Sequence, residues 1–201
     1  MEKEKRTLKF SEIFGFGAGG MFTYGFQLMI TGYYLLYYMT DIAGFSTVLA
    51  ASLYSTIQII KMVTMLFSGV IIDAINFRSG KYRTWVLVSG IGLGLFFPLS
   101  FFYYPLPQSV YVVVFMIIYT LQTLFYNVGW TAMRAVIGKV AKNKADVVAL
   151  NTSAQSAGTI SSILYGYIGY PILGIALWAG TKQAYGCASA IYGLTIILGA
   201  I

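Results

Sequence analysis

The stretch STIQIIKMVTMLFSG, from Ser55 to Gly69, consists of apolar and small polar residues around one lysine. About 20 apolar residues in a helix span the core of a bilayer, so this run predicts a membrane helix with Lys61 near its middle. No acidic residue lies within ten positions of Lys61. A charge at the bilayer centre costs at least about 2.5–3.5 kcal/mol. Lys61 is therefore expected to face the interior of a helix bundle rather than lipid.

The composition favours a membrane protein along the whole chain. Of its 201 residues, 58% are hydrophobic and 9% are charged, whereas a soluble domain carries about 25% charged residues. With Cys187 as the single cysteine, no disulfide forms within the chain. The chain has no histidine, which excludes a Ser-His-Asp triad. No cofactor or metal is expected, and a membrane enzyme is the least favoured class of function.

Apolar segments predict six transmembrane helices and hence an all-α membrane protein. The segments are residues 12–39, 47–72, 84–104, 109–132, 148–178 and 186–201. The last one ends at Ile201 without a polar tail or a basic flank. This ending predicts a chain that is truncated in its sixth helix.

The positions of the basic residues predict the orientation in the membrane. Eleven of the thirteen basic residues lie in the N-terminal tail, between the second and third segments, or between the fourth and fifth segments. By the positive-inside rule these connections are cytoplasmic. We therefore expect a multi-pass protein of the cytoplasmic membrane with its N-terminus in the cytoplasm. The same placement argues against nucleic acid as the partner of the net charge of +7.

Four predicted helices carry polar or aromatic residues at steps of three and four, which place them on one face. Single polar residues are explained by hydrogen bonds between helices, each worth about 0.6 to 2 kcal/mol. Four such faces together favour a hydrated cavity for a polyhydroxylated solute. The faces comprise Tyr24, Gln27, Thr31, Tyr34 and Tyr38; Tyr54, Gln58, Lys61, Met65 and Ser68; Tyr119, Gln122, Tyr126, Asn127 and Trp130; and Asn151, Gln155, Thr159 and Ser162.

From these faces we select the residues that are expected to bind the solute. Aromatic rings stack on sugar rings, and amides bond to hydroxyl groups. The candidates are Tyr24, Gln27, Tyr34, Gln58, Lys61, Gln122, Tyr126 and Asn127.

A second group of candidates lies between the second and third segments. It comprises Asp73, Arg78, Gly80, Lys81 and Arg83. An acidic residue at a helix end, followed by a basic cluster, predicts an ion-pair latch between helices with a gating role. The alternative is that the basic residues only flank the membrane.

Two patterns of small residues predict close helix packing. GFGAGG, from Gly15 to Gly20, matches the dinucleotide-binding pattern G-x-G-x-x-G, but that motif requires a preceding strand. Here a membrane helix follows, so we expect the glycines to admit a neighbouring helix. Ala149, Ser153, Ala157 and Ser161 recur every four residues, a spacing that lets helix backbones approach.

Three stretches carry a resemblance to a known family. They are GFGAGG, YYLLYYMTDIAGFS from Tyr33 to Ser46, and GKYRTW from Gly80 to Trp85. Together with Gly69-x-x-x-Asp73, they resemble the glycoside–pentoside–hexuronide:cation symporters of the major facilitator superfamily, the melibiose permease group. The resemblance implies that residues 1–201 are the N-terminal half of a twelve-helix transporter.

The resemblance also implies a function. A sugar, glycoside or uronide would cross the membrane by alternating access between two six-helix halves. The alternative is a non-transporting fragment or interaction protein, which needs the missing C-terminal half or a second copy of the chain as its partner.

The sequence departs from this family at the implied cation site. The family's carboxylates would fall at Lys61 and Met65 in the second helix, near Met21 or Phe22 in the first, and at Asn127 in the fourth. None of these residues is acidic, and hard cations prefer anionic oxygen ligands. Sodium coupling through this site is therefore not expected, which leaves a proton or no coupling ion.

Four accounts of Lys61 remain open. Its ammonium group takes the place of the bound cation and makes the protein a uniporter, or it binds an anionic solute such as a uronic acid or a sulfated sugar. In the third account Lys61 exchanges a proton during transport, because burial favours the neutral amine. In the fourth it pairs with an acidic residue of the missing half.

Overall fold

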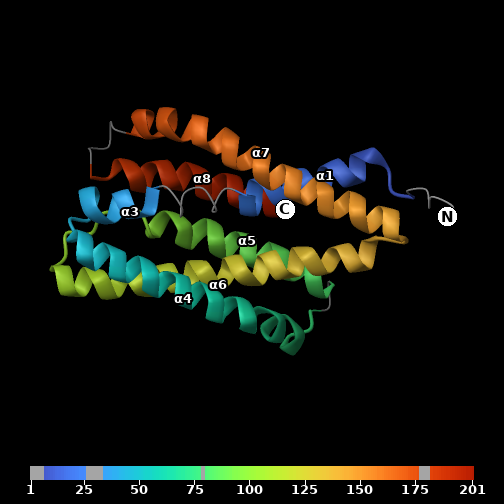
Figure 1. Cartoon of the computed structure of the whole chain (residues 1–201), viewed down its shortest axis with the longest axis horizontal. Helices are drawn as coiled ribbons and strands as arrows, with labels where there is room; N and C mark the ends of the chain where they lie inside the picture. Colours follow the sequence, from blue (N-terminus) through green and yellow to red (C-terminus); the bar gives the residue numbers. More distant parts are fainter. Residues whose placement is uncertain (1–6, 26–33, 78–79, 177–181) are drawn as a thin grey trace.

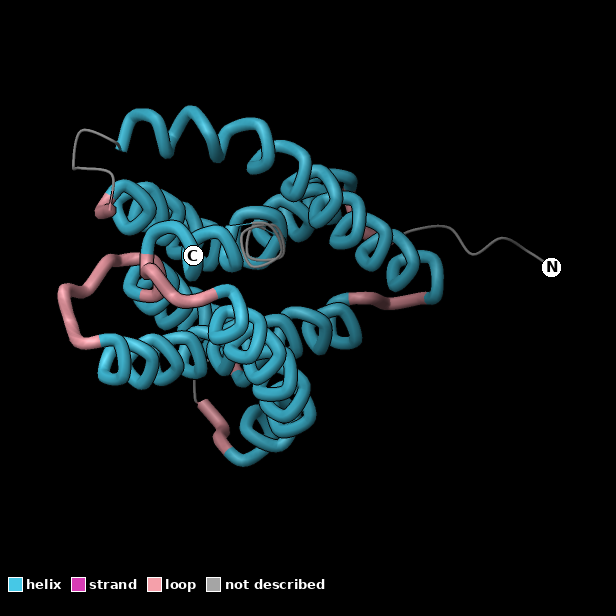
Figure 2. The backbone as a smooth tube through the Cα atoms, turned by 60° about the vertical axis from the view of Figure 1, so that its left-hand side comes forward, coloured by secondary structure: helices cyan, strands magenta, loops and turns pink. Residues whose placement is uncertain are grey.

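The computed structural model describes residues 7–25, 34–77, 80–176 and 182–201, and every regular element in these ranges is helical (Figures 1 and 2). The elements are α1 (Phe10–Gly20), the π-helix η1 (Met21–Gly25), α3 (Leu35–Tyr37), the π-helix η3 (Tyr38–Ile42), α4 (Thr47–Ala74), α5 (Lys81–Leu99), α6 (Gln108–Val140), α7 (Lys144–Ala176) and α8 (Ala184–Ala200). The prediction of an all-helical chain is confirmed for these residues.

The long helices run side by side and form two groups that meet at α5. Helix α4 packs against α6, α1 packs against α7, and α5 packs against both α6 and α8 (Figure 1). The α4–α5 and α6–α7 connections lie at the same end as the N-terminus, and the η3–α4 and α5–α6 connections lie at the opposite end. Apolar helices in such a bundle bury one face against their neighbours and leave the other for lipid or a further partner.

Helices α4, α5 and α6 are long and apolar enough to cross a membrane, at 28, 19 and 33 residues. They coincide with the second, third and fourth predicted segments. Helix α8 is also apolar, but it is shorter, with 17 residues. The total of six spans stays a prediction.

The helix ends have local causes, and two of them differ from the predicted ends. Helix α4 begins at Thr47, as predicted, because the Ser46 hydroxyl accepts a hydrogen bond from the Leu49 N–H at 3.3 Å and caps the helix. Helix α5 begins at Lys81 because Gly80 turns the chain with a φ of 103°, a conformation that favours glycine. Helix α6 continues to Val140, well beyond the predicted end at residue 132.

The first predicted helix, residues 12–39, is less regular than its sequence pattern suggests. Its described residues include the π-helical segment η1, and the π-helical segment η3 begins before its predicted end and extends to Ile42, whereas residues 26–33 lie outside the described residues. π-Helical turns often occur at functional sites, because they rotate the side chains that follow and weaken the regular hydrogen bonding.

Tyr38 of η3 packs into the core between the C-terminal end of α5 and the N-terminal part of α6. Tyr38 is completely buried, and its hydroxyl donates to the Phe102 carbonyl at 2.8 Å and lies 2.7 Å from the Tyr111 hydroxyl. Its ring contacts those of Phe101 and Phe115. Tyr38 was predicted to lie on a polar face. Its hydroxyl is instead used in hydrogen bonds that join η3 to neighbouring segments of the bundle.

The expected close packing of small residues is confirmed between α1 and α7. The backbone of Gly17 lies against Ser153, so that a Cβ atom at Gly17 would lie 3.1 Å from the Ser153 carbonyl oxygen. The Ser153 hydroxyl donates to the Ile13 carbonyl at 2.7 Å. Small residues on both helices thus permit a direct hydrogen bond from side chain to backbone.

Candidate solute-binding site

Asn127 ties α6 to the middle of α4 beside the buried lysine. Its side chain is 4% exposed, and its amide nitrogen donates to the Lys61 carbonyl at 2.9 Å and to the Thr64 hydroxyl at 2.7 Å. The helical period places Lys61 and Thr64 on the α4 face that packs against α6. Both donor hydrogens of the amide are used in this way, so Asn127 fixes the position of the Lys61 backbone.

The Lys61 side chain is half-buried and lies near an aromatic ring. Its Nζ atom is 6.0 Å from the centre of the Tyr126 ring. Within the described residues, Lys61 forms no ion pair with an acidic side chain. A cation at this distance from a ring is stabilised only weakly. The positive charge therefore remains largely uncompensated.

Tyr126 and Trp130 form an aromatic pair next to Lys61. Their ring centres are 6.3 Å apart, and the rings are nearly parallel, with an angle of 7°. Tyr24 from η1 contacts both rings edge-on at 6.0 Å and is 1% exposed. Tyr24 therefore supports the pair from within the bundle.

Arg134 continues the same face of α6 one turn further. Its guanidinium carbon lies 4.6 Å from the centre of the Trp130 ring, and Nη1 donates to the Asn151 side-chain oxygen of α7 at 3.1 Å. From the sequence, Arg134 was predicted to flank the membrane on its cytoplasmic side, and it was not among the predicted solute-binding residues. Its spacing of four residues from Trp130, which is itself four from Tyr126, is the signal that identifies it.

The other solute-binding candidates lie apart from this group. Gln122 is completely buried and accepts a hydrogen bond from the Ser100 hydroxyl of α5 at 2.6 Å. Gln58 is exposed, and Tyr34 is half-buried. Gln27 lies outside the described residues. The structure thus brings together Tyr24, Lys61, Tyr126 and Asn127, which come from η1, α4 and α6.

The cytoplasmic-loop candidates include an ion pair. Lys81 Nζ donates to Asp73 Oδ1 at 2.6 Å and joins the end of α4 to the start of α5. The Asp73 side chain is 73% exposed. Solvent screens such a pair, so it contributes at most about 1 kcal/mol to stability. Arg78 lies outside the described residues.

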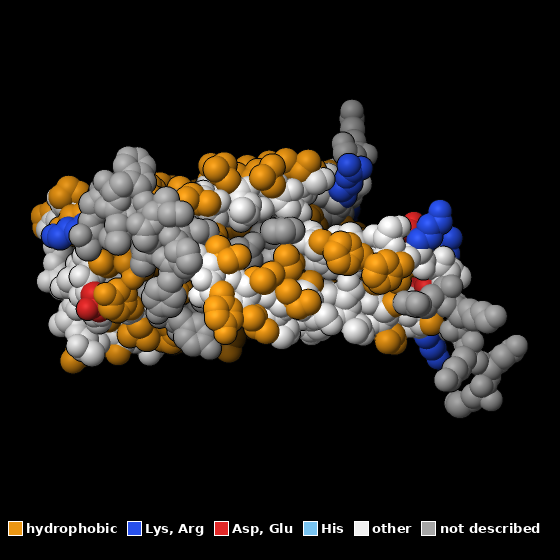
Figure 3. All heavy atoms as spheres, turned by 90° about the horizontal axis from the view of Figure 1, so that it is seen from above, with side chains coloured by type: hydrophobic (Ala, Val, Ile, Leu, Met, Phe, Trp, Pro, Cys, Tyr) orange, Lys and Arg blue, Asp and Glu red, His pale blue; other side chains and the backbone are white. Residues whose placement is uncertain are grey.

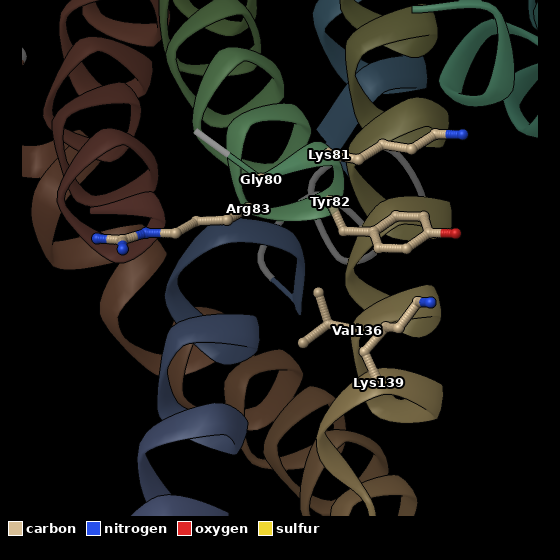
Figure 4. A pocket seen from close by; sticks show the side chains of 6 residues that line it. All are labelled: Gly80, Lys81, Tyr82, Arg83, Val136 and Lys139. Atoms are coloured by element: carbon tan, nitrogen blue, oxygen red, sulfur yellow. The ribbon is translucent and has the colours of Figure 1, made fainter. Parts of the chain in front are cut away.

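A basic pocket of about 550 Å³ adjoins this ion pair, at the N-terminal end of α5 and the C-terminal end of α6. Figure 4 shows that Lys81, Tyr82 and Lys139 point to one side and Arg83 to the other. Gly80 and Val136 complete the lining. The basic side chains come from both predicted cytoplasmic connections, as the positive-inside rule requires.

Comparison with known proteins identifies the family. A family model described as MFS/sugar transport protein matches residues 15–201. The chain belongs to this family of membrane transporters. The resemblance inferred from its motifs is thereby confirmed at the family level, and members of the MFS/sugar transport family are not enzymes.

Three relatives of this MFS/sugar transport chain carry names that refer to transport. The chain is 26% identical over 184 residues to YagG of Escherichia coli strain K12, which is named as a glycoside/cation symporter. It is 23% identical over 182 residues to the isoprimeverose transporter of Lactiplantibacillus pentosus. Each match covers 90% of the chain. The inner membrane symporter YicJ of Escherichia coli strain K12 is 24% identical over 135 residues, which is 65% of the chain.

The chain spans about two fifths of the length of the first two relatives, with 39% of YagG and 38% of the isoprimeverose transporter covered. The match to YicJ covers 29% of that protein.

Proposed function

We propose that the chain forms one half of a secondary transporter that moves a sugar, glycoside or uronide across the cytoplasmic membrane by alternating access. The observation that carries the proposal is the group of Lys61, Tyr126, Asn127 and Trp130 on facing helices of a sugar-transport family member. Ionisable residues inside a membrane bundle are costly and usually belong to the transport pathway.

The proposed pathway lies along the faces of η1, α4, α6 and α7. Its ring-binding surface is the aromatic pair of Tyr126 and Trp130, and its hydrogen-bonding groups include exposed Gln58 and half-buried Tyr34. Gln27 is assigned to the same surface from the sequence alone. Tyr24, Gln122 and Tyr126 are buried, so they would act on the solute only after the helices move.

We also propose that transport does not depend on sodium. The positions where the family resemblance implies carboxylates hold Lys61 and Asn127, and the Asn127 amide bonds to α4 directly. A fixed ammonium group there repels a second cation. Transport of the solute is then coupled to a proton or is not coupled to any ion.

Alternating access needs a second group of helices that moves against the first. The relatives are more than twice as long as the region matched. We therefore propose that a C-terminal half, or a second copy of this chain, completes the pathway. If the chain acts alone, the second candidate function applies, a membrane interaction protein that does not transport.

Uptake into proteoliposomes that contain the full-length gene product tests the proposal. We expect uptake of at least one labelled sugar, glycoside or uronide, equally with and without a sodium gradient. Lys61→Ala and Lys61→Asp should alter this uptake, and Lys61→Asp is the variant in which sodium dependence is expected to appear. Unchanged transport by both variants would refute a functional role of Lys61. No uptake of any compound of the three classes would refute the transporter itself.

A further inference from the structure

Two cations lie at opposite ends of the aromatic pair on α6. Lys61 Nζ is near the Tyr126 ring, at 6.0 Å, and the Arg134 guanidinium is near the Trp130 ring, at 4.6 Å. The two aromatic residues are one helical turn apart, and Arg134 follows after a further turn. Two positive charges thus flank an aromatic pair, in which Trp130 is half-buried and Tyr126 is buried.

Neither cation forms an ion pair with an acidic group in the part of the chain that the structure describes. Elsewhere in that part, acidic groups do find partners: Asp73 pairs with Lys81, and Asp146 accepts four hydrogen bonds. Lys61 lies in the middle of α4 and Arg134 is half-buried at the end of the apolar run of α6, so both positive charges are unfavourable unless an anion reaches them.

Arg134 is held in place rather than extended toward solvent. It is half-buried, it lies over Trp130, and Nη1 donates to Asn151. A guanidinium group has five N–H donors in a plane, so a single hydrogen bond to Asn151 leaves donors for a ligand. A fixed, planar fork of donors fits a carboxylate or a sulfate through two parallel hydrogen bonds.

Lys139, on the last turn of α6, shows what a membrane-flanking cation looks like here. Its side chain is exposed and lies near the C-terminal end of the helix (Figure 4). Arg134 and Lys139 lie on the same helix, but only the Arg134 guanidinium group is held by neighbouring side chains. Lys139 therefore serves as an example of a charge that only orients the protein.

Within the proposed sugar-transport function, we propose that the solute is an acidic sugar and that Arg134 binds its carboxylate or sulfate group. The sugar ring then lies against the accessible part of half-buried Trp130 and reaches buried Tyr126 only once the helices move, and Lys61 supplies the second positive charge. Arg134 is thus a specificity-determining residue, because a neutral sugar would leave both cations without a partner.

Matched pairs of sugars test this proposal with the full-length gene product in proteoliposomes. Each pair differs only at C6, which is a carboxylate in one member and a hydroxymethyl group in the other: D-glucuronate and D-glucose, D-galacturonate and D-galactose, methyl β-D-glucuronide and methyl β-D-glucoside. We expect the acidic member of at least one pair to bind about tenfold more tightly, as one charge-assisted hydrogen-bond pair allows.

The variants assign this preference to Arg134. R134Q should weaken binding of the acidic member more than that of the neutral member and so abolish the preference, because the charge-assisted bonds are lost. R134K should retain part of the preference, since it keeps the charge but not the planar fork. K139Q, on the same helix, should behave as the wild type.

The outcomes separate this inference from the transporter proposal. If neutral sugars are transported and none of their acidic counterparts is preferred, the inference is wrong and the transporter proposal stands. An equal loss of both pair members in R134Q, with R134K also inactive, assigns Arg134 a purely structural role and overturns the inference. If no member of any pair binds, the inference fails, and the transporter proposal is decided by its own uptake screen across the three classes. The wild-type comparison decides the solute class even where R134Q does not fold.

Discussion

Asp146 attaches the start of α1 to the α6–α7 connection. The buried carboxylate accepts hydrogen bonds from the Thr7 N–H at 2.9 Å, the Thr7 hydroxyl at 2.5 Å, the Leu8 N–H at 3.3 Å and the Lys142 N–H at 3.3 Å. It precedes the predicted fifth span, which predicts a position at the cytoplasmic surface. Asp146 was not predicted from the sequence, because Thr7 and Leu8 lie 139 and 138 positions away from it along the chain.

The pH dependence of this attachment follows from its hydrogen bonds. The Thr7 hydroxyl, with the backbone donors, lowers the pKa of the Asp146 carboxyl below its ordinary value. A lowered folded-state pKa means that the stabilisation is present above the unfolded-state value of about 3.9. It is lost as the pH falls through the folded-state pKa.

We therefore expect Asp146→Asn to release the segment at neutral pH, and the wild type to release it only below about pH 4. Hydrogen exchange of the Thr7 and Leu8 amides measures the release, which should speed exchange by roughly tenfold. Asp73→Asn is the control, since Asp73 lies away from this segment and should leave both amides protected. Protection that is the same in Asp146→Asn and the wild type would contradict the expectation.

The Asp73–Lys81 ion pair should matter more for transport than for stability. Because Asp73 is largely exposed, Asp73→Asn should lower the free energy of unfolding by less than about 1 kcal/mol. If the pair is a latch, the same variant should change the uptake rate several-fold, and Lys81→Gln should match it. A wild-type uptake rate in both variants would leave the pair with no gating role.

The positions of individual side chains could be predicted where the helical period alone decides which face of the helix they lie on. Lys61, Tyr126 and Asn127 do lie at one contact between α4 and α6, as their spacing indicates. Gln122 follows the same period, but its amide bonds to Ser100 of α5. Arg134 was assigned by its charge alone, and its contact with Asn151 depends on how α6 and α7 pack. Periodicity gives the face, and tertiary packing decides which neighbour occupies it.

At the scale of helices, α5 and α8 approach through glycine. A Cβ atom at Gly94 would lie 2.7 Å from the Gly193 carbonyl oxygen and 2.5 Å from Ile197 Cγ1. The carbonyl belongs to the backbone of α8, so it cannot move without moving the helix. Helices α5 and α8 therefore pack through direct contact of their backbones at these glycines, and not through large side chains.

Gly94→Ala should therefore separate α5 from α8 and destabilise the bundle by about 1–3 kcal/mol, the usual cost of overpacking. Thermal unfolding of the protein in detergent measures the loss. Gly69→Ala is the matched control, because nothing lies within 4 Å of a Cβ atom at Gly69 and alanine favours a helix. A melting temperature for Gly94→Ala equal to that of Gly69→Ala would show that the contact is not tight.

Helix existence was predicted well from the sequence, and helix ends were not. Apolar runs located α4, α5 and α6, because burial in lipid requires uninterrupted apolar length. The extension of α6 to Val140 carries Arg134 and Lys139 beyond the apolar run. Polar residues continue a helix as readily as apolar ones once it leaves the hydrocarbon region. No pattern in the sequence predicts the π-helical turns η1 and η3.

For the whole molecule, the charge pattern and the fold agree. Lys and Arg side chains gather mainly at one end of the bundle in Figure 3, the end where the α4–α5 and α6–α7 connections lie in Figure 1. The agreement is informative, because the positive-inside rule uses only the order of charges along the chain, whereas the fold brings those segments together in space. The sequence could not provide the pairing of α5 with both α6 and α8, which depends on glycine contacts between distant segments.

This agreement predicts the orientation of the protein, and labelling of single cysteines tests it. In a Cys187→Ser background, which leaves no other cysteine, Lys142→Cys lies in the α6–α7 connection and Leu106→Cys in the α5–α6 connection. Both side chains are exposed. A membrane-impermeant maleimide should label Leu106→Cys in right-side-out vesicles and Lys142→Cys only in inside-out vesicles. The Cys187→Ser parent should stay unlabelled in both. Labelling of the two positions from the same side would mean that α6 does not cross the membrane, and labelling in the reverse pattern would place the basic connections outside the cell, where the positive-inside rule forbids them.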